Sequence, residues 1–248
     1  MSSPKILTLD IETSPHIASV WGLFQQNVSL NQLRECTTVI SWAAKWHGDK
    51  KVLFRSDHHD GHDVLVSDIW DLLDEADIVL GWNQKGFDLK HLNREFLLAG
   101  LLPPSKYHIL DLMLETRRNF RFASNKLDHV SQQLDIGSKL HHTGMDLWNG
   151  CVIDNDPKSW ALMKRYNIQD VKLTEKVFDA LKPWLKLPNM ALYMDLEGKV
   201  CTSCGSANLE RMGFLTKTTG KYQRYRCNDC GRTSTDPKRV STTELRPE

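Results

Sequence analysis

The residues that decide the fold are Ile6-Leu7-Thr8-Leu9-Asp10-Ile11-Glu12-Thr13, close to the start of the chain. The apolar run from Ile6 to Asp10 predicts a buried strand. Asp10 and Glu12 lie two residues apart at the end of this strand, so its period places both carboxylates on one face of the sheet. The two groups repel each other unless a cation lies between them. Taken alone, the pair fits a metal site and a strand that ends in solvated acids equally well.

Predicted strands and helices alternate over the residues that follow. Further strands are predicted at residues 37–45, 51–55, 78–80 and 108–112. Apolar residues at helical spacing predict helices at residues 64–76, 89–97 and 127–134. Asp156, as N-cap, and Pro157, at the first helical position, start a long helix that runs to about Leu181. This order predicts an α/β fold with helices on the faces of a mixed β-sheet.

Two more carboxylates lie on predicted helices. Asp88 is in the first turn of the helix after the strand at residues 78–80, where an acid also stabilises the helix through its dipole. Tyr166 and Asp170 are four residues apart in the long helix and share one face. Most pairs at this spacing lie on the surface, but an apolar set on the same helix allows this pair to line a cleft at the edge of the core.

Together these residues resemble the three motifs of the DnaQ-like 3′→5′ exonucleases, in the order that the family has them. Residues 7–13 resemble the first motif, Asn83-x-x-x-Phe87-Asp88 the second, and Tyr166-x-x-x-Asp170 the third, in its tyrosine-bearing DEDDy form. The resemblance covers residues 5–181 and is close to the exonuclease domains of family B polymerases and their phage-encoded relatives. It implies an RNase H-like fold, with which the predicted element order is compatible.

The resemblance also implies a catalytic site with two divalent cations. Asp10 would bridge the ions, Glu12 and Asp170 would hold the one that activates water, and Asp88 would serve the second, partly through water. Tyr166 would orient the attacking water. Oxygen ligands suit Mg²⁺ or Mn²⁺, and two such ions stabilise both the attacking and the leaving oxygen of a phosphodiester.

The substrate's path is less defined by the sequence. By the family pattern, Thr13, Asn83 and Phe87 border the terminal nucleotide, whereas Asn83 and Phe87 equally suit a turn and the core. Leu9, Ile11 and Trp82 are expected to pack in the interior. Two segments depart from the family pattern or add to it. One is an insertion at residues 16–36. The other is residues 139–148, whose His, Lys and Trp side chains suit contact with nucleic acid, although we favour a solvated loop.

Four of the six cysteines form two Cys-x-x-Cys-Gly sequences, at Cys201/Cys204 and Cys227/Cys230. The glycines allow tight turns that bring two thiolates to one ion, and four thiolates make a closed structural zinc site. A pair of redox dithiols would need a thioredoxin-like context that this sequence lacks. The spacing resembles that of zinc ribbons, with residues 211–215 and 221–226 as the hairpin between the two turns.

The charge distribution separates the cysteine module from the rest. Residues 199–248 contain ten basic and five acidic side chains, whereas residues 1–198 contain 22 basic and 26 acidic ones. Residues 221–226 combine basic and aromatic side chains, which suits contact with phosphates and bases. We expect the ribbon to contact nucleic acid or to bind replication or repair proteins.

The sequence therefore predicts a metal-dependent 3′→5′ exonuclease that acts on DNA in preference to RNA, at single-stranded ends. The alternatives are an RNase H-like endonuclease or resolvase, and a non-catalytic protein that binds nucleic acid. The expected domains are the exonuclease at residues 1–182, a linker at 183–198, the zinc ribbon at 199–234 and a flexible tail at 235–248. We expect no membrane association and a cytoplasmic protein, in the host cytoplasm if a phage encodes it.

Overall fold

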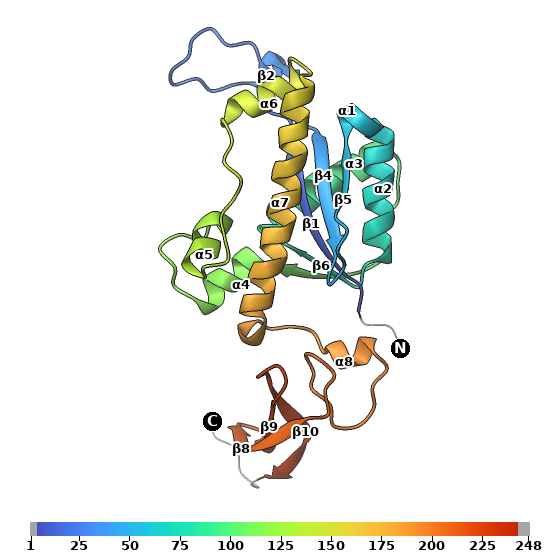
Figure 1. Cartoon of the computed structure of the whole chain (residues 1–248), viewed down its shortest axis with the longest axis vertical. Coiled ribbons are helices and arrows are strands. Elements are labelled where there is room, and N and C mark those ends of the chain that lie inside the picture. Colours follow the sequence, from blue (N-terminus) through green and yellow to red (C-terminus); the bar gives the residue numbers. More distant parts are fainter. Residues whose placement is uncertain (1–3, 243–248) are drawn as a thin grey trace. The chain divides into compact units, whose positions relative to one another are not determined.

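The computed structural model describes residues 4–242. The chain divides into two compact units, one of residues 5–179 and the other containing Ala180 and the residues after it. Figure 1 draws the elements of both units in sequence colours.

The larger unit contains seven strands and most of the helices. Its strands are β1 (Ile6–Thr13), β2 (Ile17–Ala18), β3 (Leu33–Glu35), β4 (Val39–Trp46), β5 (Leu53–Ser56), β6 (Ile78–Gly81) and β7 (His108–Asp111). Its helices are α1 (Asp57–Asp60), α2 (His62–Glu75), α3 (Asp88–Leu98), α4 (Leu112–Asn119), α5 (Leu127–Gln133), α6 (Met145–Val152) and α7 (Pro157–Leu181), with a 3₁₀ turn η1 at Leu30–Gln32.

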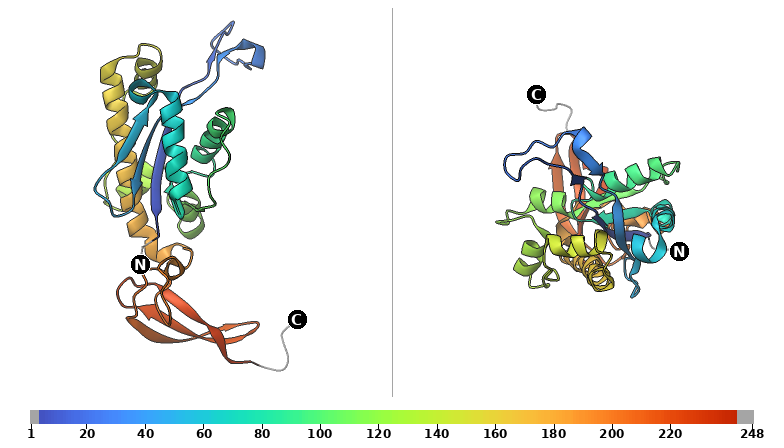
Figure 2. Two further views of the ribbon diagram at one scale, coloured as in Figure 1. Left: turned by 90° about the vertical axis from the view of Figure 1, so that its right-hand side faces the viewer. Right: turned by 90° about the horizontal axis from the view of Figure 1, so that it is seen from above.

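Five of these strands form one mixed sheet in the order β5-β4-β1-β6-β7. Strand β1 pairs antiparallel with β4 and parallel with β6, and β7 continues the parallel part. Helix α7 lies over one face of the sheet, and α2 and α3 lie over the other (Figure 2). The predicted α/β fold with a mixed sheet between helices is thus confirmed.

The face of the sheet toward α2 and α3 holds the main core. Alternate residues of β1, namely Leu7, Leu9 and Ile11, point into it and are at most 3% exposed. Across the antiparallel pair, Trp42 of β4 lies on the same face, and its indole N–H donates to the Leu65 carbonyl at 2.8 Å. Because strand side chains alternate, the remaining residues of β1 must face α7.

The face toward α7 is polar where β1 and β4 pair. The register sets Thr8 opposite Lys45, Asp10 opposite Ala43 and Glu12 opposite Ser41. Lys45 is buried and forms an ion pair with Glu175 of α7. Helix α7 therefore covers this face through polar contacts, and the two acids of β1 lie beneath it.

The start of α7 agrees with the prediction from Asp156 and Pro157. Asp156 Oδ2 accepts hydrogen bonds from Ser159 N at 2.9 Å and from Ser159 Oγ at 2.8 Å. The cap satisfies donors that have no partner within the helix. This fixes the beginning of the helix that carries Tyr166 and Asp170.

The second unit is a three-stranded sheet in the order β10-β9-β8, formed by β8 (Leu209–Lys217), β9 (Gly220–Cys227) and β10 (Thr233–Ser241). It also contains η2 (Lys182–Trp184) and α8 (Met190–Tyr193). The segment predicted as a linker, 183–198, contains α8, whose Met190 N–H donates to the Thr202 carbonyl at 2.8 Å. The predicted flexible tail is wrong for residues 235–241, which pair with β9 through backbone hydrogen bonds, whereas residues 243–248 lie outside the described part.

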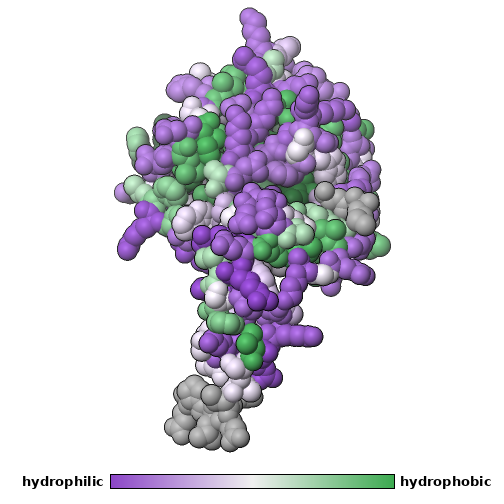
Figure 3. All heavy atoms as spheres, turned by 60° about the horizontal axis from the view of Figure 1, so that its bottom comes forward, coloured by the Kyte–Doolittle hydropathy of each residue, from purple (hydrophilic) through white to green (hydrophobic). Residues whose placement is uncertain are grey.

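Within residues 4–242, no helix has both the length and the hydropathy required to cross a membrane. Hydrophilic residues predominate on the face of the molecule drawn in Figure 3.

Candidate active site

Three of the predicted carboxylates meet between β1 and α7. One carboxyl oxygen each from Asp10, Glu12 and Asp170 lies within 4.8 Å of the other two. Asp10 and Glu12 remain partly exposed, while Asp170 is 1% exposed. The strand period brings the first two together, and α7 adds the third from the covering layer.

Asp88 lies beside this cluster at the start of α3. Its Oδ1 accepts a hydrogen bond from the backbone N–H of Ile11, between the two acids of β1, at 3.1 Å. Strand β6 pairs with β1 only as far as Thr8, which leaves the edge of β1 at Ile11 open to this side chain. Asp88 is not one of the three residues whose oxygens meet within 4.8 Å, although it is buried next to them.

The turn before Asp88 is held by Asp111, at the end of β7. The carboxylate of Asp111 accepts hydrogen bonds from Asn83 N at 3.1 Å and Lys85 N at 3.0 Å. It also caps α4 by accepting from the N–H groups of Met113 and Leu114. One buried carboxylate therefore fixes both the turn that precedes Asp88 and the helix that follows β7.

Asn167 of α7 holds Asp10 in place. Its Nδ2 donates to Asp10 Oδ2 at 2.6 Å and to the Asp10 carbonyl at 3.1 Å. Its Oδ1 accepts from Ser41 Oγ of β4 at 3.2 Å, and Asn167 itself is 0% exposed. The amide thus joins the two central strands to α7 and leaves little freedom for the Asp10 side chain.

Tyr166 lies next to the cluster through Lys139. The ammonium of Lys139 donates to Asp170 Oδ2 at 2.5 Å and to the Tyr166 hydroxyl at 3.0 Å. The rings of His142 and Trp148 pack edge-on against Tyr166, at centroid distances of 4.8 and 6.2 Å. The interpretation of residues 139–148 as a solvated loop is therefore wrong for these side chains, since their contacts are with residues of α7.

The acids repel one another strongly. Burial raises the pKa of Asp10 well above its usual range, and the charges of Glu12, Asp170 and Asp88 add to the effect. Burial and the charge of Asp170 raise the pKa of Glu12 to about 8, and burial raises that of Asp88 to about 7. The charge of Lys139 lowers the pKa of all three groups. Lys139 therefore offsets only part of the negative charge.

The donor set fits a hard divalent cation. Within the described part of the chain, Asp170 Oδ1 is buried without a hydrogen-bond partner. A buried carboxylate oxygen without a partner is costly, and a cation among these oxygens would remove that cost and the mutual repulsion. An all-carboxylate set of oxygens suits Mg²⁺ or Mn²⁺.

The residues expected to border the substrate lie around the cluster without meeting it. Thr13 ends β1 at an irregularity of its pairing with β4. Asn83 adopts a positive φ of 64° in the turn held by Asp111, and Phe87 is 38% exposed with its ring 4.6 Å from that of His91. Of the three residues expected to pack in the interior, Leu9 and Ile11 are buried and Trp82 is half-buried.

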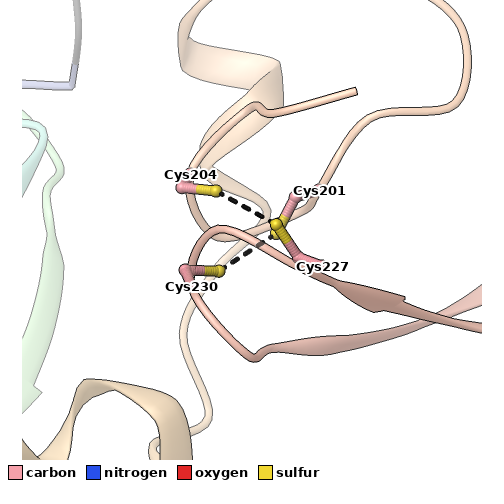
Figure 4. A group of neighbouring side chains, drawn as sticks. All are labelled: Cys201, Cys204, Cys227 and Cys230. Carbon is pink, nitrogen blue, oxygen red and sulfur yellow. Dashed lines mark hydrogen bonds between the residues drawn. The ribbon is translucent and has the colours of Figure 1, made fainter. Parts of the chain in front are cut away.

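The second unit contains the four-cysteine cluster. The Sγ atoms of Cys201, Cys204, Cys227 and Cys230 all lie within 4.8 Å of one another, and their side chains converge in Figure 4. Two matching turns supply them. Gly205 and Gly231 follow these turns with φ of 75° and 73°, and donate to the carbonyls of Cys201 and Cys227. Four thiols in this arrangement fit a tetrahedral zinc ion.

Three residues contact the acidic site in roles that the sequence motifs do not predict: Asn167, Lys139 and Asp111. Asn167 lies directly after Tyr166 and three residues before Asp170. The helix period therefore places it near the face that carries these two candidates, where it is buried. Lys139 and Asp111 have no such signal. Lys139 meets Asp170 across 31 positions of sequence, and Asp111 meets Asn83 across 28.

Comparison with known proteins agrees with this architecture. A sequence model of the RNase H superfamily matches residues 28–182, more than half of the chain. A solved structure of the family B DNA polymerase from the hyperthermophilic archaeon Pyrobaculum calidifontis is similar with a TM-score of 0.57 at 16% sequence identity. The similarity covers 77% of this chain and 26% of the polymerase, so this chain corresponds to about a quarter of that protein. No curated protein matches the sequence.

Proposed function

The chain belongs to the RNase H superfamily, and from that premise we propose that it is a metal-dependent 3′→5′ exonuclease that acts on single-stranded DNA ends. Membership supports a nuclease with a nucleic acid as its substrate. The observation that carries the finer proposal is the meeting of Asp10, Glu12 and Asp170, with Asp88 and Tyr166 next to them. These are the five residues that resemble the DEDDy exonuclease motifs.

In this proposal the four carboxylates would hold two Mg²⁺ or Mn²⁺ ions, which would supply a water-derived nucleophile and charge neutralisation for phosphodiester hydrolysis. Asp10 and Glu12 present their oxygens from a rigid strand, and Asp170 adds its oxygens from α7. Asn167 keeps the carboxylate of Asp10 oriented through two hydrogen bonds. The backbone N–H of Ile11 donates to Asp88 Oδ1 and so holds this carboxylate beside β1.

Tyr166 acts as a hydrogen-bond donor in this scheme. Burial raises its pKa above the usual value, so the phenol keeps its proton at neutral pH. Lys139 donates to the phenol oxygen, and a hydrogen bond with Tyr166 lowers the pKa of Asp170, so the phenol acts as a donor beside this carboxylate. A role as general base is disfavoured because the phenolate is rare under these conditions.

The decisive experiment is digestion of 5′-labelled single-stranded DNA and RNA with Mg²⁺ or Mn²⁺. A ladder that shortens one nucleotide at a time from the 3′ end is the expected product, with DNA cut faster than RNA. A few discrete internal cuts would instead indicate an endonuclease. Asp10→Ala should lower the rate by at least about a thousandfold. Unchanged cleavage by this variant would rule out the site assignment.

The structural metal of the second unit is proposed to be a single zinc ion. Burial opposes ionisation of Cys227, but hydrogen bonds from the backbone N–H groups of Cys230 and Asp229 outweigh it and lower the pKa to about 7. Thiolates are the form that binds zinc. The four cysteine ligands leave no open position, so this ion has no part in the hydrolysis.

A further inference from the structure

The inserted segment between β1 and β4 exposes an unusual set of apolar side chains. Trp21 is 99% exposed, Leu23 89%, Phe24 87% and Leu30 86%. These residues lie in the excursion between β2 and β3, which extends beyond the end of the main sheet in Figure 1 and in the left view of Figure 2. Exposed apolar clusters of this kind mark surfaces that bind another molecule.

The fold of the excursion does not depend on these apolar side chains. At its base, Ile17 and Ala18 pair with Glu35 and Leu33, and Ser19 N–H donates to the Gln32 carbonyl at 2.9 Å. Arg34 Nε donates to Ser19 Oγ at 2.8 Å. The 3₁₀ turn η1 is closed by a reciprocal capping box between Ser29 and Gln32. Polar contacts thus hold the base of the segment, while the side chains of Trp21 and Phe24 are almost fully exposed.

The composition of the excursion suits stacking and hydrogen bonding with nucleic-acid bases. The 22 residues from Thr13 to Arg34 contain no aspartate or glutamate, although the chain has 31 acidic residues in all. Amide side chains, which can bond to the edges of bases, follow the two aromatic rings: Gln25, Gln26, Asn27, Asn31 and Gln32. Residues 19–32 carry no charged side chain, so they neither attract nor repel phosphates, and the two accessible rings are favourable for base stacking.

The excursion also starts at the proposed active site. Thr13 ends the strand that carries Asp10 and Glu12, and β2 begins four residues later at Ile17. A strand whose 3′ end reaches the carboxylates therefore passes close to the point where the excursion leaves the body. This continuity argues for the substrate itself as the occupant in preference to a separate partner.

We infer that residues 19–32 form a stacking arm for the single-stranded nucleic acid upstream of the scissile bond, with Trp21 and Phe24 as its two platforms. The inference rests on the proposed nuclease function for the identity of the strand. It adds a binding element outside the carboxylate site, and the sequence motifs of the exonuclease do not include it. Stacking of one base on a ring strengthens binding by about fivefold to a hundredfold.

The test compares Trp21→Ala/Phe24→Ala with Leu97→Ala/Leu98→Ala, a control pair on α3 that is also exposed, at 76% and 74%. Binding of a labelled single strand of about 20 nucleotides is measured by fluorescence anisotropy in EDTA, which prevents cleavage. The arm variant should raise Kd at least about tenfold, and the control pair should leave it within about twofold. Equal Kd values for wild type and the arm variant would overturn the inference.

Single substitutions separate stacking from plain apolar contact. Trp21→Phe retains an aromatic face and should bind within about threefold of wild type, whereas Trp21→Leu retains only an apolar surface and should bind about fivefold more weakly or worse. If Trp21→Leu binds the strand as well as Trp21→Phe does, the stacking arm is refuted. The same follows if the arm variant changes only the oligomeric state in light scattering and leaves the Kd for the strand unchanged.

Failure of the proposed function gives a different result. Wild-type protein that degrades neither DNA nor RNA with Mg²⁺ or Mn²⁺ would remove the exonuclease proposal, while the anisotropy comparison would still report on the arm. For an active enzyme, the ratio of kcat/KM on a strand of about 12 nucleotides to that on a dinucleotide should fall about tenfold in the arm variant. A ratio equal to that of wild type would contradict the arm.

Discussion

Among single residues, Asn167 contacts the acid cluster directly, through Asp10, without being an acid itself. Its amide donates twice to Asp10 and accepts from Ser41, within the interior. Asn167→Leu retains the approximate volume but removes all three bonds. We expect the Mg²⁺ concentration for half-maximal activity to rise, or kcat to fall, by about 10- to 100-fold, because residues that orient metal ligands have effects of this size.

The control for this prediction is Gln169→Leu, a partly exposed amide on the same helix. It should change neither parameter by more than about twofold. Thermal unfolding of both variants shows whether the amide acts on the site or on the fold. A loss of activity in Asn167→Leu that is explained entirely by unfolding at the assay temperature would contradict the positioning role.

The raised pKa values of Glu12 and Asp88 make the stability of the protein depend on pH. Acids whose folded pKa is raised favour the folded state fully below their ordinary pKa, and that contribution is lost as pH rises through about 7 to 8. Without a metal ion, these acids should therefore lower the free energy of unfolding progressively as the pH rises from about 5 to about 8. A divalent ion that binds the ionised carboxylates reverses this.

We expect added Mn²⁺ to raise Tm more at about pH 8 than at about pH 5.5, since protonated carboxyls bind the ion weakly. Differential scanning fluorimetry at fixed ionic strength measures both shifts. Asp10→Asn is the control variant, and its Tm gain at the higher pH should be smaller than that of wild type. An equal gain at the two pH values would show that these carboxylates do not bind the ion.

The acids and the residues that support them differ in how far the sequence predicts them. Asp10, Glu12, Asp88, Tyr166 and Asp170 were predicted by motif, and the structure brings the three metal-ligand candidates of β1 and α7 together. Lys139 and Asp111 were missed because their roles come from tertiary contacts, whereas Asn167 was missed although the helix period places it near Asp170. A lysine that neutralises an acid 31 residues away has no local signature in the sequence.

At the level of elements, the turn between β6 and α3 depends on Asp111. This buried carboxylate accepts from backbone N–H groups at Asn83, Lys85, Met113 and Leu114. Asp111→Ala leaves all four donors without this partner and should lower the free energy of unfolding by about 3 kcal/mol, because each buried unsatisfied donor costs about 1–3 kcal/mol and some will reach water. Urea unfolding measures the change.

Asp74→Ala is the matched control, since Asp74 accepts a single bond from Ser105 N–H at an exposed site. Its cost should stay below about 1 kcal/mol. Asp111→Ala should also reduce nuclease activity by more than the control does, because the turn that positions Asp88 loosens. A loss in Asp111→Ala no larger than in Asp74→Ala would show that other contacts hold the turn.

The elements themselves were predictable where local signals were strong. The apolar run of β1 and the Asp156-Pro157 start of α7 gave correct elements. Helix α6 was not predicted, and its first residues fall in the segment 139–148 that was interpreted as a solvated loop. Strand β10 was missed because its residues are polar and one is Pro237, and its pairing with β9 is long-range and irregular. Edge strands of this kind are defined by the partner strand.

At the scale of the whole molecule, the proposal of two domains predicts that they respond differently to loss of zinc. Cys230→Ser removes one of four ligands, and metal binding in such small modules is coupled to folding. Purified wild-type protein should contain about one zinc per chain, and the variant much less. Hydrogen exchange should show lost protection in β8, β9 and β10 and unchanged protection in β1 and α7.

Cys36→Ser, at an exposed cysteine outside the cluster, should leave the zinc content unchanged. If Cys230→Ser retains the full zinc content, the four-thiolate site is wrong. Loss of protection throughout β1 and α7 in this variant would instead show that the two units do not fold independently.

We propose that the second unit contacts nucleic acid, because basic residues outnumber acidic ones in it. Arg224 and Arg226 are exposed and two residues apart on β9, so both point to one face of the sheet. On β9 Lys221 lies over the ring of Phe214, a residue of β8, at 4.4 Å. Each phosphate contact to a single strand changes the slope of log Kd against log salt by about 0.7.

Arg224→Ala/Arg226→Ala should therefore reduce that slope by about 1.4 if each arginine contacts one phosphate, and should weaken binding more at low salt than at high salt. The matched control is Lys50→Ala/Lys51→Ala, which removes two exposed charges close in sequence to His47. The backbone N–H of His47 donates to the Ile6 carbonyl, at the start of β1. This end of β1 is opposite to Glu12, so the control should not alter the slope. An unchanged slope in the arginine variant would leave protein docking as the role of the ribbon, because its positive charge would then not be used on the substrate.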